Sequence, residues 1–382
     1  MSNPLRFVAL LTPFALLLAG PAFAQGDDEE KTGPESGRVI VAAANASVQL
    51  QDAEPKAVAP GTIFTYSITN GPWIWSDRHW GWVKRADTVE LSEAIATFTK
   101  IYQEAKDADG DEAQREAAVA LHHRGISKLA LGSAEAAIED FEAAEKLGLD
   151  TAQLQMNFAN AYRTLGKFDE AVEAATEAIR RAPDSSQAHD IRAGVLFEQD
   201  QFEASLVDSD QAVALDEANA EAFNNRGVTR RVMGQYRQAA EDYTRALKIA
   251  PRHPQALANR GYALKKLGRY KDAIRDYERA IKVNPDEPVV YNDLAWLLAT
   301  CPEEAIRDPE RAIELGETAV EMAPEDGRFL DTLAAAYAAA GQFEKATETG
   351  LEAVKKLDEA EQFEADQRVA MYIDGKPYVE GK

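Results

Sequence analysis

The residues best able to carry out chemistry in this sequence are few and lie far apart. They are five histidines and one cysteine, at His79, His122, His123, His189, His253 and Cys301. A metal centre needs several His, Cys, Asp or Glu side chains at a spacing that directs them to one ion, and these residues show no such spacing. The sequence also lacks a glycine-rich phosphate loop and a G-x-S-x-G nucleophile motif. We therefore expect no catalytic residue, no metal and no cofactor.

The charge of the chain argues against nucleic acid as a partner. The 382 residues include 65 Asp plus Glu and 42 Lys plus Arg, a formal net charge of −23 at pH 7. Binding to phosphates requires an excess of Lys and Arg at the contact face. The exception is residues 220–287, with 15 basic and 8 acidic residues, net +7.

The basic segment permits three interpretations. It binds an acidic segment of another protein, or it binds the acidic end of a second copy, and both contacts would weaken with salt. Alternatively, its cations pair with nearby acids, and the acidic surface elsewhere serves only solubility. The local acids in question are Glu241, Asp242, Asp272 and Asp276.

The first 24 residues have the layout of a secretory signal peptide. Arg6 is a positive start, residues 7–18 form a short apolar run, and Ala22-Phe23-Ala24 is a small-x-small cleavage site. The run is shorter than the roughly 20 apolar residues that span a bilayer, so cleavage is favoured over an uncleaved anchor. We expect a periplasmic or secreted protein without an integral membrane span after cleavage. Residues 25–37 are acidic and rich in Gly, Ser and Pro, and they predict a flexible linker.

Residues 38–90 follow a strand pattern. Val39, Val41, Val48 and Leu50 have the two-residue spacing of strands, and residues 62–68 are rich in β-formers before an Asn-Gly turn at 70–71. Four of the five tryptophans lie between positions 73 and 82. A W-x-W strand followed by a Gly-Trp-Val strand resembles bacterial Src homology 3-like domains, which implies a small all-β barrel. Its aromatic residues either bind a peptide or cell-wall ligand or fill the core of a spacer; the candidates are Trp73, Trp75 and Trp80.

The rest of the chain repeats every 34 residues. One column reads Gly132, Gly166, Asp200, Gly234 and Gly268, and a second reads Ala144, Ala178, Ala212, Ala246 and Ala280. The second column continues at Ala319 and Ala353, so one interval contains five extra residues, which lie in a loop within 299–309. Asp308 followed by Pro309 predicts a helix start, because Asp accepts hydrogen bonds from free first-turn amides and Pro lacks a donor that would not be needed there. A further column holds only small residues, which allow two helices to approach closely. It consists of Gly125, Ala159, Ala193, Gly227, Gly261, Ala295 and Ala334.

These columns resemble the tetratricopeptide repeat family over residues 118–358. The resemblance implies a mainly α fold, a right-handed α-solenoid of about seven helical hairpins preceded by the small barrel. The expected repeats are 118–151, 152–185, 186–219, 220–253, 254–287, 288–326 and 327–358. A capping helix and linker are expected over 91–117, with the linker at 104–113, and a capping helix and tail over 359–382. Asp200 and Glu217 replace the usual Gly and Pro of the third repeat, which is expected to be the loosest.

The resemblance also implies a binding groove lined by the first helix of each hairpin. Amides there would bond an extended peptide backbone, and cations would bind an acidic side chain or a C-terminal carboxylate. The candidate groove residues are Asn157, Asn160, Arg163, Asn224, Asn225, Arg231, Asn259, Tyr262, Lys265 and Lys266. We expect a non-enzymatic protein-interaction scaffold of the cell envelope that also self-associates or contacts the cell wall. The alternative is a peptidoglycan-associated assembly module that uses the barrel tryptophans. A separate alternative for the groove is that some of its asparagines only satisfy neighbouring loops.

Overall fold

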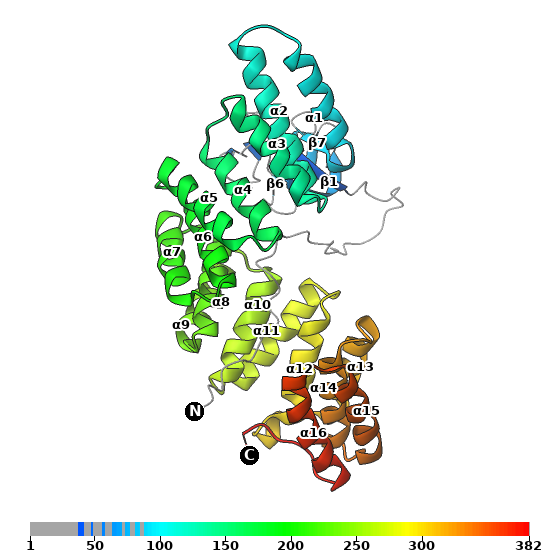
Figure 1. The fold of residues 1–382 in the computed structure, drawn as a ribbon. Helices are drawn as coiled ribbons and strands as arrows, with labels where there is room; N and C mark the ends of the chain where they lie inside the picture. Colours follow the sequence, from blue (N-terminus) through cyan, green and yellow to red (C-terminus); the bar gives the residue numbers. More distant parts are fainter. Residues whose placement is uncertain are drawn as a thin grey trace. The chain divides into compact units, whose positions relative to one another are not determined.

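The computed structural model describes residues 37–41, 47–48, 56–57, 63–70, 73–76, 81–84 and 88–381 (Figure 1). Side chains are described for residues 38–41 and 89–381. The expected signal peptide over 1–24 and linker over 25–37 therefore lie almost wholly outside the described residues, and both remain predictions. Contacts divide the chain into two compact units, Met1–Leu215 and Asp216–Lys382, which we call the first and second units.

The strands precede the helices and form one antiparallel sheet with a short separate ladder. The order in the sheet is β6-β5-β4-β1-β7, and β2 pairs with β3. In the register of β5 and β6, Trp75 lies opposite Trp82. The described pairings do not join the two edges of the sheet, so a closed barrel remains a prediction. The strands are β1 (Gly37–Val41), β2 (Ser47–Val48), β3 (Lys56–Ala57), β4 (Ile63–Asn70), β5 (Trp73–Ser76), β6 (Gly81–Lys84) and β7 (Thr88–Glu90).

Sixteen α-helices make up nearly all of the chain after residue 90. The first unit contains α1 (Leu91–Lys106), α2 (Asp111–Ala130), α3 (Ala134–Lys146), α4 (Ala152–Thr164), α5 (Phe168–Arg181), α6 (Ser186–Glu198) and α7 (Phe202–Leu215). The second unit contains α8 (Ala220–Val232), α9 (Tyr236–Ile249), α10 (Pro254–Lys266), α11 (Tyr270–Val283), α12 (Pro288–Thr300), α13 (Pro309–Met322), α14 (Gly327–Ala339), α15 (Phe343–Lys356) and α16 (Glu359–Ile373). Consecutive helices pack as antiparallel hairpins, α2 with α3 and so on to α14 with α15 (Figure 1).

The linker expected over 104–113 is wrong. Helix α1 continues to Lys106, and α2 begins at Asp111 after a turn at Gly110 with φ 109°. Asp111 and Glu112 place negative charge at the N-terminal end of α2, where the helix dipole favours it. Helix α1 packs against α2, and its buried Phe98 shares a core with Ile40 of the sheet. The segment 91–117 is therefore a packed helical pair rather than a cap followed by a linker.

A close fit between facing residues holds each hairpin together. A Cβ atom built on Gly125 would lie 2.4 Å from the Phe141 ring, and one built on Gly227 would lie 2.6 Å from the Tyr243 ring. Gly261 faces Tyr277 in the same way. Because the second-helix ring fills the interface, only glycine fits opposite it. The fully buried Tyr243 and Tyr277 are among the largest core side chains of the second unit.

The turns within the hairpins require a left-handed residue. Gly132, Gly166, Gly234 and Gly268 have φ between 69° and 84°, and Asp200 takes the same place with φ 59°. Aspartate tolerates this region better than most residues with a Cβ. The five-residue insertion forms a short 3₁₀ turn at Glu304–Ile306 between α12 and α13. Asp308 then caps α13 by accepting a hydrogen bond from the Arg311 amide at 3.2 Å, so the expected helix start at Asp308-Pro309 is confirmed.

Candidate protein-interaction surface

Three cations surround one tyrosine ring on the first helices of the second unit. Arg231 of α8 lies 5.2 Å from the Tyr262 ring centroid, and Lys265 and Lys266 of α10 lie at 5.3 and 5.5 Å. Each position allows a cation–π attraction, but the three positive charges also repel one another. Among the described residues, two carboxylates act on these cations. Glu380 Oε1 lies 3.8 Å from Lys266 Nζ, and the charge of Asp293 on α12 interacts with those of Lys265, Arg231 and Lys266. We call Arg231, Tyr262, Lys265 and Lys266 the cationic cluster.

Charges around the cationic cluster affect its titration. Partial burial lowers the pKa of Lys266, but the neighbouring Tyr262 and Glu380 outweigh this effect and raise it overall. Burial raises the pKa of Asp293 on α12, although Lys265 and Arg231 oppose the rise. The ammonium group of Lys266 is thus kept charged at neutral pH. An exposed, charged lysine beside a partly buried ring suits an acidic ligand group.

The three predicted asparagines of the second unit form a polar row next to this cluster. Asn259 donates a hydrogen bond from Nδ2 to Oδ1 of Asn224 at 3.2 Å, which joins α10 to α8. Asn224 and the adjacent Asn225 are buried, whereas Asn259 is partly exposed. The amide of Asn259 is therefore the one of the three best placed for an external peptide backbone.

The predicted groove residues of the first unit make local contacts instead. Asn157 and His122 share a hydrogen bond of 2.8 Å between Nδ2 and Nε2, and both side chains are buried. Arg163 Nε lies 3.2 Å from Glu198 Oε1, with both side chains largely covered. Asn160 is partly buried. Seven of the ten predicted residues, from Asn224 to Lys266, thus lie on α8 and α10. In the first unit, Asn157 and Arg163 instead contact residues of the same unit.

The two adjacent histidines of α2 are core residues. Their rings stack at 5.8 Å, and His123 also packs against Phe98 at 5.1 Å. Burial lowers the pKa of His122 to about 3, with a smaller contribution from His123, and burial lowers the pKa of His123 to about 4. Both rings are therefore neutral near pH 7.

Sequence reasoning missed a recurring Arg–Asp pair between the two helices of a hairpin. Arg260 Nε lies 2.6 Å from Asp276 Oδ2, and the arginine always precedes the aspartate by sixteen residues. The signal that could have revealed the pair is the sixteen-residue spacing of Arg and Asp, which recurs in four of the repeats. The pairs are Arg124–Asp140, Arg192–Asp208, Arg226–Asp242 and Arg260–Asp276. Within residues 220–287, Arg226, Arg230 and Arg260 are therefore bound to Asp242 and Asp276 inside the fold, while the net excess of seven positive charges remains.

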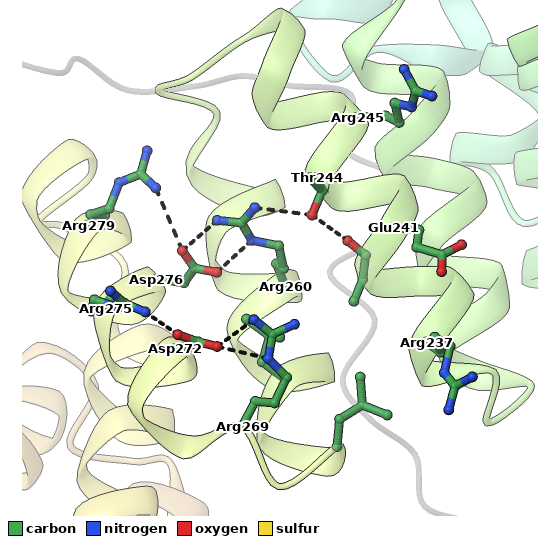
Figure 2. A pocket seen from close by; sticks show the side chains of 13 residues that line it. Arg237, Glu241, Thr244, Arg245, Arg260, Arg269, Asp272, Arg275, Asp276 and Arg279 are labelled. Carbon is green, nitrogen blue, oxygen red and sulfur yellow. Dashed lines mark hydrogen bonds and ion pairs between the residues drawn. The ribbon is translucent and has the colours of Figure 1, made fainter.

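A second basic surface lies on the side of the second helices. A hollow of about 620 Å³ is lined by α9, α10 and α11. Figure 2 shows Arg260 bridging Asp276 and Thr244, and Asp272 held between Arg269 and Arg275. Arg237 and Arg245 lie on α9 across the hollow and are exposed (Figure 2). The hollow is lined by six arginines and three acids, and its acids Asp272 and Asp276 are already bound by arginines.

Comparison with known families decides what the hairpins are. One model described as tetratricopeptide repeat matches residues 220–253 and 254–287, and a second with the same description matches 122–185 and 156–222. The chain carries tetratricopeptide repeats. Neither matching model describes an enzyme, and tetratricopeptide repeat proteins are generally non-catalytic scaffolds. No curated protein matches the chain.

Solved tetratricopeptide structures share the fold. A tetratricopeptide repeat protein from Parabacteroides merdae is 18% identical with a TM-score of 0.50, covering 68% of this chain and 99% of its own. PilF of Pseudomonas aeruginosa is 19% identical with a TM-score of 0.50, covering 58% of this chain and 97% of its own. The Cut9–Hcn1 hetero-tetramer of the APC/C is 18% identical with a TM-score of 0.53, covering 64% of this chain and 48% of that one. At these identities the likeness shows the tetratricopeptide fold alone.

The barrel aromatics stay outside the described side chains. Trp73 and Trp75 lie in β5, but their side chains are not described, and Trp80 lies outside the described residues altogether. Among the described residues, no group of three or more His, Cys, Asp or Glu side chains is arranged to hold a metal ion. No described helix combines the length and hydrophobicity that crossing a bilayer requires.

Proposed function

We propose that this tetratricopeptide protein is a non-enzymatic scaffold of the bacterial cell envelope that binds an extended, acidic segment of a partner protein on the first helices of its second unit. The observation that carries the proposal is the cationic cluster, where three positive charges lie within 5.5 Å of one ring centroid. An acidic side chain of a ligand would relieve their repulsion. Asn259 stands next to it to bond a peptide backbone.

The place of action follows from the first 24 residues, whose basic start, apolar run and small-x-small site favour export. A cell-wall role for the tryptophan-rich strands and self-association through the acidic surface remain alternatives within the same compartment. Binding of an acidic partner segment or of a second copy to the cationic cluster is expected to weaken as salt rises, because exposed charges are screened over about 8–10 Å at physiological ionic strength.

An affinity capture from an envelope extract tests the proposal. The purified protein is compared with Lys266→Glu, which reverses an exposed charge of the cationic cluster, and with Lys248→Glu, which reverses an exposed charge on α9 away from it. We expect a defined protein to be retained by the wild type and by Lys248→Glu, and to be lost at least tenfold with Lys266→Glu. Equal retention by both variants would remove the cationic cluster from the binding site. Retention of peptidoglycan alone would favour the strand region instead.

A further inference from the structure

The chain turns back on itself after α16. Gly375, with φ 69°, donates its N–H to the Tyr372 carbonyl at 2.9 Å, and Lys376 donates to the Met371 carbonyl at 2.9 Å. These two bonds close the C-terminal end of α16, and the left-handed glycine reverses the direction of the chain. The segment Lys376–Gly381, which we call the tail, then runs from α16 toward α12 and α10 (Figure 1).

Tyr378 is the aromatic contact of the tail. Its ring centroid lies 5.7 Å from that of Trp296 on α12, and the guanidinium of Arg368 lies 5.5 Å from the Trp296 centroid and 5.6 Å from the Tyr378 centroid. Asp331 holds Arg368 in place through two hydrogen bonds of 2.7 and 3.1 Å. The place of the tyrosine is therefore fixed by groups that belong to the helices and do not depend on the tail.

Glu380 joins the tail to the helices through its backbone N–H and through its carboxylate. Its N–H donates to the Thr300 carbonyl at 2.8 Å, which uses a carbonyl at the end of α12 that has no helical partner. Its carboxylate lies 3.8 Å from Lys266 of the cationic cluster. The tail thus presents an aromatic residue and an acid two positions apart.

We infer that the tail is an intramolecular occupant of the partner site, and that the partner segment which displaces it carries the same arrangement, an aromatic residue followed two positions later by Glu or Asp. The inference rests on the proposed function, because it defines the ligand of that same site. Glu380 and Asp293 together oppose two of the three positive charges of the cationic cluster, so a partner segment with a further acid would bind more strongly than the tail does.

The contact is weak enough to be exchanged. Lys376 and Pro377 are exposed, and Tyr378, Val379 and Glu380 are each only partly buried. A tethered segment has an effective concentration on the order of 1 mM. If the same segment binds with a Kd of about 0.1 mM when free, the tail would weaken binding of an external copy about tenfold.

A defined peptide tests the inference. A fluorescein-labelled peptide with the sequence of Asp374–Gly381 is titrated with the full chain and with a variant that lacks residues 376–382, and binding is followed by fluorescence anisotropy. We expect the shortened protein to bind about tenfold more tightly than the full chain. Lys266→Glu in the shortened protein should abolish binding, whereas Lys248→Glu should not change it. A peptide with Gln in place of Glu380 should bind at least fivefold more weakly.

A second variant guards against a folding defect. The full-length double variant Tyr378→Ala with Glu380→Gln keeps the chain length and should bind the peptide as tightly as the shortened protein does. Equal affinity of the full and shortened proteins for the peptide would overturn the inference. Loss of helicity by circular dichroism in both tail variants would also overturn it, because the tail would then be part of the folded core.

The outcomes for the two proposals are separable. If the partner captured from the envelope is lost with Lys266→Glu but is retained equally with and without the tail, the proposed function stands and the tail inference fails. If the peptide behaves as expected while capture is unaffected by Lys266→Glu, the tail contact is real but the cationic cluster is not the partner site.

Discussion

The first and second units build the same hairpins but leave different charges on their first helices. In the first unit Asn157 is bonded to His122, and Arg163 lies beside Glu198. In the second unit three cations share the Tyr262 ring, and one of them contacts Glu380 of the tail. The difference teaches that the repeat skeleton and the binding face are specified by separate residues. The residues of the skeleton recur every 34 positions, whereas the residues of the binding face differ from one repeat to the next.

The largest expected effect comes from the shared skeleton and should be equal in both units. Asp140 is bonded by Arg124 and Lys128, and Asp242 by Arg226 and Arg230. Replacing either aspartate by Ala leaves two buried cations together, which costs about 3–5 kcal/mol of unfolding free energy. Asp272→Ala is the matched control, because the arginines that bind Asp272 are exposed, and it should cost about 1 kcal/mol or less. Urea unfolding followed by circular dichroism measures the three variants, and similar losses for all would show that the recurring pair is not structural.

The next-largest effect is a loss of stability at low pH that should be greater in the first unit than in the second. Burial lowers the pKa of His122 to about 3 and of His123 to about 4, so the folded first unit keeps both rings neutral while the unfolded chain takes up protons below about pH 6.5. The contribution of the two rings to stability is therefore full above pH 6.5 and falls toward pH 4, by about 3 kcal/mol for each ring. Hydrogen exchange measured by mass spectrometry at pH 7 and pH 4.5 should show α2 and α4 opening more than α8 and α10.

The variant His122→Gln with His123→Phe is the control for acid sensitivity. Glutamine can still bond Asn157, and phenylalanine can still pack on Phe98, but neither takes up a proton. The difference in exchange between the units should then shrink. If the wild type and the variant lose stability in parallel, carboxylates rather than these histidines cause the acid sensitivity.

A smaller effect tests the fit between facing residues. Gly227→Ala places a methyl group 2.6 Å from the Tyr243 ring, and the strain should cost about 2 kcal/mol. The double variant Gly227→Ala with Tyr243→Ala reproduces the pair Ala159 and Ala175 of the second repeat. A double-mutant cycle by urea unfolding should give a favourable coupling on the order of 1 kcal/mol. Strict additivity would show that the two positions do not constrain each other.

The smallest effect sharpens the contrast between a structural cation and a binding cation. Arg163→Ala removes the cation beside the partly buried Glu198, so the unfolding free energy of the first unit should fall by about 1 kcal/mol. Burial already raises the pKa of Glu198, although Arg163 opposes the rise. Lys266→Ala removes an exposed side chain and should change stability by less than about 0.5 kcal/mol. A larger loss of unfolding free energy for Lys266→Ala than for Arg163→Ala, measured by urea unfolding, would show that Lys266 is the structural residue of the two.

The sequence was sufficient for the skeleton because the skeleton is periodic. The glycine column predicted where the turns lie, and Asp308-Pro309 predicted the start of α13. Asp200 was expected only to loosen the third repeat, and its left-handed conformation was not predicted. The linker at 104–113 was predicted wrongly because Asp and Gly residues near 107–111 are as typical of a helix start as of a loop. The groove residues could be placed on the first helices, but whether Asn157 or Asn259 remains available depends on long-range neighbours. No spacing in the sequence pointed to Glu380, which reaches Lys266 only because α16 ends in a reversal.

The facing pairs in the hairpins also limit how such a protein can be recombined. Glycine stands opposite Phe or Tyr in three hairpins, whereas the second repeat has alanine at both corresponding positions, Ala159 and Ala175. In the last hairpin, Ala334 faces Gly350. Exchanging α4 with α8 would therefore set an alanine against Tyr243 in one place and open a void beside Ala175 in the other. Exchanging whole hairpins would keep every pair intact. The hairpin, and not the helix, is thus the smallest module that duplication, gene shuffling or protein engineering can move along this chain.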